Sequence, residues 1–108
     1  MLSEAVIQQQ ICDYLSAAGY FYFSVPNEHY NISHGQRTQL KKMGLTPGIP
    51  DLVVCLENGR VIFLEVKTAK GKLTGSQPFI HLALQKKGHT VYIVRSVEDV
   101  QIVLEEIS

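Results

Sequence analysis

Two apolar runs on either side of a short polar turn constrain the fold of this chain more than any other feature. They span residues 52–56 (LVVCL) and 61–64 (VIFL), and the turn between them reads ENGR. Apolar runs that flank an Asn-Gly turn predict a β-hairpin. Because polar residues do not alternate within either run, we expect both strands to be covered on both faces, as central strands of an α/β sheet are.

Charged residues mark the open end of this predicted hairpin. Asp51 directly precedes the first strand, and Glu65 and Lys67 follow the second. Neighbouring carboxylates repel each other and are costly to keep ionised unless a cation lies between them, and a hard divalent ion such as Mg²⁺ is the natural occupant. Lys67 shares a strand face with Glu65, where its ammonium could hold a water or stabilise charge on a phosphorus centre. The pattern favours metal-assisted phosphodiester hydrolysis.

Each of these motifs also has an ordinary structural explanation. A Glu-x-Lys pattern on one strand face is often a surface ion pair, and Pro-Asp is a common turn. The apolar context favours a functional site, because unpaired charges are rarely left beside strands that are buried on both faces.

The length of the turn decides whether one metal ion can reach both acids. A regular two-residue turn would pair Asp51 with Val66, so that Glu65 would point to the opposite face. We therefore predict a three- or five-residue loop, a bulge, or a bend at Pro50-Asp51 that returns both carboxylates to one face.

Helical and strand patterns surround the hairpin. Apolar spacing and capping residues predict three main helices, from Ser3 to Gly19, from Ser76 to Gly88 and from Ser96 to Ile107. Further strands are expected over 20–25 and 89–94, and a polar loop over 27–35, with His29, Tyr30 and His34, leads to a short helix over 36–43. The main elements then follow the order α-β-β-β-α-β-α, an α/β fold.

Three helical side chains could approach the charged end. Glu4 lies in the first turn of the leading helix, where the helix dipole also favours an acid for purely structural reasons. Gln77 opens the second main helix and offers a donor and an acceptor. His81 lies one helical turn later on the same face, although a core or surface position is its simpler interpretation.

Length and composition indicate one compact domain over residues 1–108. No apolar run approaches the about 20 residues of a membrane span, and the first residues lack the basic region of a signal peptide, so we expect a cytoplasmic protein. Cys12 and Cys55 lie in apolar stretches without metal-type spacing, and we interpret them as core residues rather than as a disulfide or zinc site.

Charge gives a mixed indication of nucleic-acid binding. The formal net charge is zero, whereas most nucleic-acid-binding domains are basic. Basic residues nevertheless cluster on both sides of the hairpin, at Arg37, Lys41, Lys42, Lys70 and Lys72. Local patches of this kind set the field that a phosphate experiences, although a solvated surface explains them equally well.

Short motifs are spread along nearly the whole chain, and their residues are Glu4, Gly44, Pro47-Gly48-Ile49-Pro50-Asp51, Glu65-Val66-Lys67-Thr68, Gly71-Lys72-Leu73-Thr74, Gln77, Gly88, Val91-Tyr92-Ile93-Val94 and Arg95-Ser96. In their order and spacing, these motifs resemble the virus-type replication-repair nuclease (VRR-NUC) family of the PD-(D/E)XK nuclease superfamily. One departure is Pro78 directly after Gln77, which the first turn of a helix accommodates.

The resemblance implies a restriction-endonuclease-like core, in which helices flank a mixed central β-sheet. It also implies DNA cleavage that depends on Mg²⁺ or Mn²⁺, and short stand-alone viral members act as Holliday-junction resolvases. On this reading Asp51 and Glu65 bind the metal together with the Val66 carbonyl, and Glu4 contributes directly or through water. Lys67 positions or activates the attacking water.

The sequence is also compatible with other functions. The alternatives are a non-catalytic DNA-binding module with the same fold, a monomeric flap or single-strand nuclease, and a protein-interaction domain, which leaves the paired acids unexplained. Resolution of a four-way junction requires two related incisions, so a resolvase is expected to be a two-fold homodimer. The aromatic run at 20–23 is a candidate interface, and a place in the sheet core is its simpler interpretation.

Overall fold

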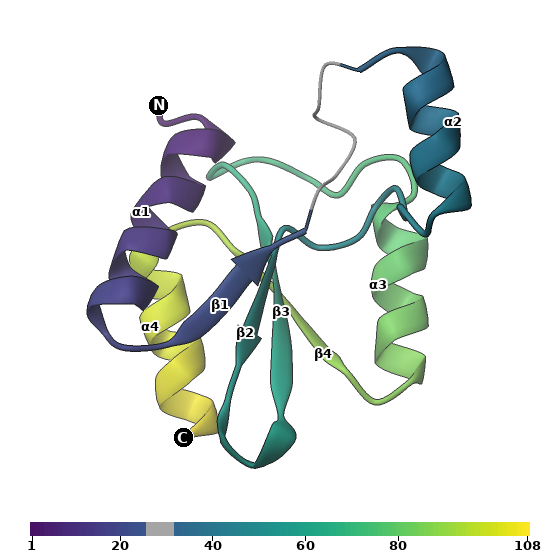
Figure 1. Cartoon of the computed structure of the whole chain (residues 1–108). Helices are drawn as coiled ribbons and strands as arrows, with labels where there is room; N and C mark the ends of the chain where they lie inside the picture. Colours follow the sequence, from purple (N-terminus) through teal and green to yellow (C-terminus); the bar gives the residue numbers. More distant parts are fainter. Residues whose placement is uncertain (26–31) are drawn as a thin grey trace.

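The computed structural model describes residues 1–25 and 32–108 (Figure 1). Its helices are α1 (Glu4–Ala17), α2 (His34–Lys42), α3 (Gln77–Lys86) and α4 (Val97–Ile107), and its strands are β1 (Phe21–Ser24), β2 (Leu52–Cys55), β3 (Val61–Val66) and β4 (Thr90–Val94). The predicted order α-β-β-β-α-β-α is confirmed, with the short helix α2 inserted between β1 and β2.

The strands form one mixed four-stranded sheet in the order β1-β2-β3-β4. The pairs β1–β2 and β2–β3 are antiparallel, whereas β3 and β4 are parallel and connected through α3. A parallel pair requires such a crossover, so the helix between the last two strands follows from the sheet topology. Because β2 and β3 are the central strands, the hairpin predicted from the two apolar runs occupies the middle of the sheet.

Helices cover the two faces of the sheet unequally. In Figure 1, α1 and α4 lie on one side of the sheet and α3 lies on the other. The hydrophobic core fills the space beneath α1 and α4, and its members are Ile7, Ile11, Leu15, Leu52, Val54, Ile62, Leu64, Val66, Val94, Val100, Val103 and Leu104. Glu65 and Lys67 alternate with Leu64 and Val66 along the chain, so they point to the face that α3 covers.

Serine residues fix where three helices begin. The hydroxyl of Ser3 accepts from the N–H of Val6 at 3.2 Å, and that of Ser96 accepts from Asp99 at 3.1 Å. The start predicted for the short helix was wrong by two residues, because Ser33 and Gln36 form a capping box that begins α2 at His34. Ser76 precedes α3 but makes no side-chain cap hydrogen bond.

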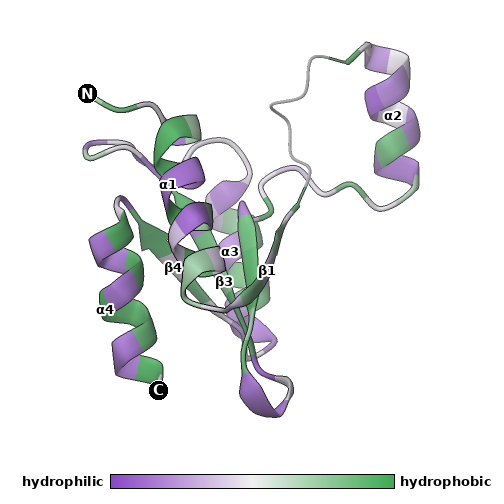
Figure 2. Cartoon of the chain, turned by 60° about the vertical axis from the view of Figure 1, so that its left-hand side comes forward, coloured by the Kyte–Doolittle hydropathy of each residue, from purple (hydrophilic) through white to green (hydrophobic). Residues whose placement is uncertain are grey.

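The predicted polar loop is only partly within the described residues. His29 and Tyr30 lie outside them, and His34 is an exposed residue of α2 rather than of a loop. No residue of α2 is buried, and Figure 2 shows a mostly hydrophilic helix that stands away from the sheet.

The aromatic residues of β1 divide between the two faces. Tyr22 packs against the core, whereas Phe21 is 70% exposed and Phe23 is 46% exposed. The simpler interpretation of this run as core is therefore wrong for the two phenylalanines, because α3, which lies on their face, packs mainly against β4 at the opposite edge of the sheet. Cys12 and Cys55 are half-buried free thiols. No helix in the described part of the chain is long and apolar enough to cross a membrane.

Candidate active site at the open end of the hairpin

The β2–β3 hairpin has a five-residue loop, one of the lengths predicted from the sequence. Cys55 pairs with Val61, which leaves residues 56–60 to form the loop. Continued to the open end of the ladder, this register places Asp51 opposite Glu65. Directly opposed residues of an antiparallel pair project from the same face, so the loop length brings both carboxylates together.

Main-chain contacts hold Asp51 at this end. Its Oδ2 accepts a hydrogen bond from the N–H of Val66 at 2.8 Å, and its carbonyl accepts from the N–H of Val25 at 3.0 Å. Val66 therefore joins the site through its N–H, and ligation of a metal by its carbonyl stays a prediction.

A glycine allows the segment before Asp51 to approach α3. Gly48 has φ of +91°, and a Cβ atom there would lie 2.8 Å from the carbonyl carbon of Ser76 and 2.9 Å from the nitrogen of Gln77. Only glycine fits such a contact without a backbone shift. The close approach connects the loop that carries Asp51 to the start of the helix that carries Gln77.

Glu65 is the most enclosed charged residue of the site. It is 1% exposed, and two side chains of α3 contact its carboxylate. His81 Nε2 lies 2.9 Å from Oε1, and Gln77 Nε2 donates to Oε2 at 3.4 Å. The Gln77 amide is oriented by a second hydrogen bond, in which its Oε1 accepts from the N–H of Thr74 at 2.9 Å.

The surroundings of Glu65 make ionisation difficult. Burial raises the pKa of Glu65 to about 9, and a hydrogen bond with Asp51, the charge of Asp51 and the charge of Glu4 act in the same direction. Lys67 opposes this shift. Burial, with the charge of Lys67, also lowers the pKa of His81. Without another cation, the protein therefore holds Glu65 protonated and His81 neutral at pH 7.

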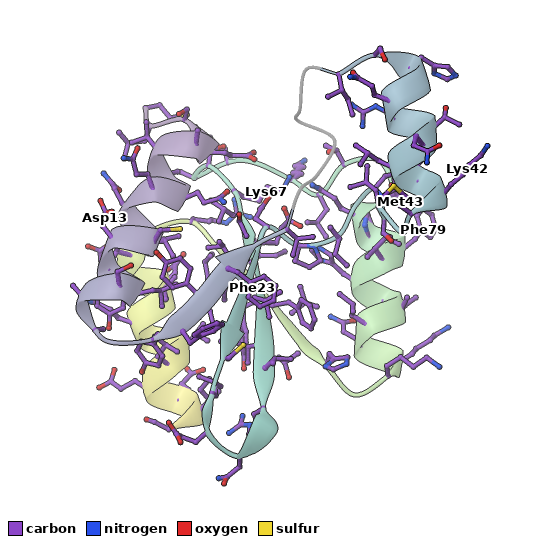
Figure 3. All side chains as sticks on the ribbon, in the orientation of Figure 1. Asp13, Phe23, Lys42, Met43, Lys67 and Phe79 are labelled. Carbon is purple, nitrogen blue, oxygen red and sulfur yellow. The ribbon has the colours of Figure 1, made fainter. Side chains whose placement is uncertain are left out.

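Lys67 provides a positive charge beside these acids. Its side chain is 4% exposed, and its main-chain N–H donates to the carbonyl of Val94 at 3.0 Å. Figure 3 shows Lys67 at the end of β3, between α1 and α3. Its charge acts on both Glu65 and His81, so the structure brings the predicted lysine to the predicted acids.

Glu4 lies further out than the other acids. It is half-buried in the first turn of α1, and it acts on Glu65 through its negative charge. Direct ligation of a metal by Glu4 stays a prediction.

The donor atoms suit a hard divalent ion. Asp51 and Glu65 offer carboxylate oxygens, and Mg²⁺ is commonly held by one or two carboxylates while it keeps several waters. Within residues 1–25 and 32–108, no group of three or more His, Cys, Asp and Glu side chains has an arrangement suited to metal binding, so main chain or water must complete a coordination shell. A cation between the two carboxylates would favour their ionised forms and so oppose the effect of burial and of the Asp51 charge on the pKa of Glu65.

One arginine orders the basic loop that follows Lys67. Arg95 Nη1 donates to three carbonyls, those of Thr68 at 2.6 Å, Gly71 at 2.8 Å and Ala69 at 3.3 Å. The loop carries the exposed Lys70 and Lys72, so it presents two cations next to the site. The other predicted phosphate-binding residues, Arg37, Lys41 and Lys42, form a separate basic group on α2.

Two contacts in this region were not predicted from the sequence. The sequence favours a core or surface position for His81, whereas in the structure it is the nearest α3 partner of Glu65. Its position one turn after Gln77 was the available signal. Arg95 belonged to a matching motif, but neither charge nor spacing indicated that it binds the carbonyls of the loop.

Comparisons with known proteins agree with this architecture. A family model for the VRR-NUC domain matches residues 4–98. A solved structure described as a VRR_NUC domain is 25% identical, with a TM-score of 0.68 and coverage of 94% of both chains. Another, described as a VRR_NUC domain protein, is 17% identical, with a TM-score of 0.79 and coverage of 98% of this chain and 88% of the other, which shows a shared fold. No curated protein matches significantly. The family match spans most of the sequence, and this chain therefore belongs to the VRR-NUC nuclease family.

Proposed function

We propose that this protein is a Mg²⁺-dependent endodeoxyribonuclease, with Mn²⁺ as a substitute, that hydrolyses phosphodiester bonds in branched DNA. The observation that carries the proposal is the convergence of Asp51, Glu65 and Lys67 at one end of a central hairpin. A structural ion pair would need one acid for one lysine, and a second buried acid only adds a desolvation cost. Membership of a nuclease family supports hydrolysis as the reason for this arrangement.

The residues divide the work according to their positions. Asp51 and Glu65 would hold the metal, with the Val66 carbonyl and Glu4 as further candidates. A bound Mg²⁺ supplies polarisation of the scissile phosphate and stabilises the charge that develops during in-line displacement. Gln77 lies beside Glu65 and donates to its Oε2 at 3.4 Å.

Lys67 acts on the phosphate and the attacking water. Its ammonium is held in a buried position, where a charge interacts more strongly than it does in bulk water. It orients the water and stabilises negative charge on the phosphate as the bond to phosphorus forms.

DNA binding would use two basic groups. Lys70 and Lys72 lie on the loop that Arg95 holds beside the site, and Arg37, Lys41 and Lys42 lie on α2. Contacts of lysine and arginine with phosphate depend on local charge rather than on the net charge of zero. The two groups would position the backbone without reading its sequence.

We propose a homodimer for junction resolution, since two incisions on strands of like polarity need two related sites. The exposed Phe21 and Phe23 of the edge strand β1 are candidates for the interface. Beside them an apolar groove of about 520 Å³ is lined by Val25, Leu40, Met43, Gly44, Leu45, Thr46, Ile49 and Phe63.

A panel of labelled substrates tests this function. Four-way junctions, flaps, single strands and linear duplexes are incubated with the protein in Mg²⁺ and in EDTA. We expect the junction to be cut into two nicked duplexes only when Mg²⁺ is present. Binding without cleavage of any substrate would instead support a DNA-binding module, and cleavage of flaps or single strands alone would support a simpler nuclease.

A further inference from the structure

The two fully buried residues of α3 are polar, where a helix packed on a sheet ordinarily buries apolar ones. Its two buried residues are Gln77 and His81, whereas Phe79 and Leu82 of the same helix are exposed. An amphipathic helix usually turns its apolar residues toward the sheet. Beside the half-buried Ile80 and Leu84, both of these fully buried polar side chains contact one group, the carboxylate of Glu65.

Of these two contacts, the one from His81 is the closer. The distance from His81 Nε2 to Glu65 Oε1 is 2.9 Å, against 3.4 Å for Gln77 Nε2 to Oε2. His81 is 5% exposed, so this hydrogen bond forms away from solvent. A buried polar ring at a helix–sheet contact is costly without a partner, and Glu65 is that partner.

The hydrogen bond between His81 and Glu65 restricts the terminal torsion of the Glu65 side chain. The terminal torsion of a glutamate is broad, so packing of the carbon atoms alone does not orient the two oxygens. Mg²⁺ demands near-ideal octahedral geometry, so a freely rotating carboxylate is a poor ligand. Hydrogen-bond partners behind a ligand therefore influence how tightly the metal is bound.

We propose that His81 is a positioning residue for the metal site: with Glu65 ionised and His81 in its Nε2–H tautomer, Nε2 donates to Oε1 and fixes the rotation of the carboxylate, so that the free lone pairs face Asp51. This inference rests on the proposed function, because it requires that Asp51 and Glu65 bind a divalent ion. His81 itself does not contact the metal, the water or the phosphate. It acts on metal affinity through Glu65.

Two substitutions of His81 that place an amide nitrogen at different distances from Glu65 test the proposal. In His81→Gln the amide nitrogen extends about as far as Nε2 of the imidazole, whereas in His81→Asn it falls short. Titration calorimetry with MgCl₂ and with MnCl₂, on the protein without DNA, measures metal affinity directly. The dependence of junction cleavage on Mg²⁺ concentration provides the second readout. Gln85→Ala, an exposed residue one turn further along α3, is the matched control.

We expect His81→Asn and His81→Ala to bind both metals roughly 10- to 100-fold more weakly, with affinity largely restored in His81→Gln. Cleavage by the two weak variants should recover at high Mg²⁺, and Gln85→Ala should match the wild type. Circular dichroism and thermal unfolding confirm that each variant is folded.

The outcomes distinguish this inference from the function on which it rests. A wild-type protein that binds Mg²⁺, together with a folded His81→Ala that binds it equally well, would overturn the positioning role alone. Loss of Mn²⁺ binding with unchanged Mg²⁺ binding in His81→Ala would also overturn it, by making His81 a direct ligand. A wild-type protein that binds neither metal would overturn both proposals.

Discussion

Among the described residues, Glu65 is the acidic side chain whose burial most strongly opposes its ionisation. Its carboxylate is almost completely enclosed, it lies beside Asp51, and Lys67 is the cation that acts on it. An ordinary core would place an apolar residue there, because a buried acid without an equal counter-charge destabilises the fold. The free-energy cost of burying the Glu65 carboxylate is the clearest physical sign of a functional site.

The burial of Glu65 predicts how stability depends on pH in the metal-free protein. The pKa of Glu65 is raised from 4.5 to about 9, so between these values the folded chain holds a proton that the unfolded chain has released. The resulting contribution to the free energy of unfolding is complete below pH 4.5 and is lost as the pH rises toward 9. Urea denaturation in EDTA, at a series of pH values, measures this decline.

Glu65→Gln is the control for the pH series. The lowered pKa of His81 acts in the opposite direction, because the unfolded chain then binds the proton more tightly. The difference between the wild type and Glu65→Gln therefore isolates the glutamate. If the two proteins show parallel pH dependence across this window, the account of Glu65 is wrong.

Lys67 is expected to act on turnover more than on DNA affinity. Lys67→Met keeps most of the buried volume and removes the charge, so we predict a fall in the single-turnover rate of about 100-fold or more. DNA affinity, measured by fluorescence anisotropy in EDTA, should change little, because Lys67 is 4% exposed. Equal losses in both measurements would assign Lys67 to binding instead.

Among the elements, the hairpin was the most predictable from sequence and the contacts of α3 were the least. The loop length followed from the requirement that Asp51 and Glu65 share a face, and the observed register meets it. The contact of His81 with Glu65 joins residues 16 positions apart through the packing of a helix on a sheet, which no local pattern specifies. α2 begins two residues earlier than predicted, because the Ser33–Gln36 capping box fixes its start at His34.

The loop after β3 is expected to bind DNA phosphates through its two lysines. Lys70→Ala and Lys72→Ala should each weaken DNA binding and lower the slope of log affinity against log salt by about 1, because each removes a phosphate contact. Lys86→Ala, at the far end of α3, is the control. An unchanged slope in both loop variants would place the DNA elsewhere.

Arg95 is expected to order the same loop through its hydrogen bonds, and its own charge is not expected to contact DNA. Arg95→Met removes hydrogen bonds to three carbonyls, so amide hydrogen exchange over residues 68–72 should accelerate. DNA affinity should fall while the salt slope is kept, because both lysines remain. Unchanged exchange in this loop would show that the arginine does not order it.

Helices cover one face of the sheet well and leave the other face partly open. α1 and α4 enclose the core, whereas Phe21 and Phe23 remain exposed on β1. The fold class followed from the order of the apolar patterns. The exposure of Phe21 and Phe23 could not be predicted from the sequence. A strand with aromatic residues on both faces has the same sequence pattern whether its second face is covered by a helix or by another chain.

Dimerisation through this face can be tested directly. Phe21→Ser with Phe23→Ser should convert a dimer into a monomer that nicks one strand of a junction. Phe21 is 70% exposed, so its replacement should change monomer stability little, whereas Phe23 is 46% exposed and its replacement should destabilise the monomer by about 1 kcal/mol. Light scattering at micromolar concentration, with and without a junction, measures the state. A wild-type protein that stays monomeric on the junction would exclude the symmetric resolvase.

The proposed active site requires that Asp51 and Glu65 share one divalent ion for cleavage of DNA. Junction cleavage in Mg²⁺ by Asp51→Asn, compared with the wild type, tests it most directly, because the change keeps the size of the side chain and removes its charge. We predict that Asp51→Asn folds, retains most of its DNA affinity and does not cut. Full Mg²⁺-dependent cleavage by Asp51→Asn would contradict the proposed site.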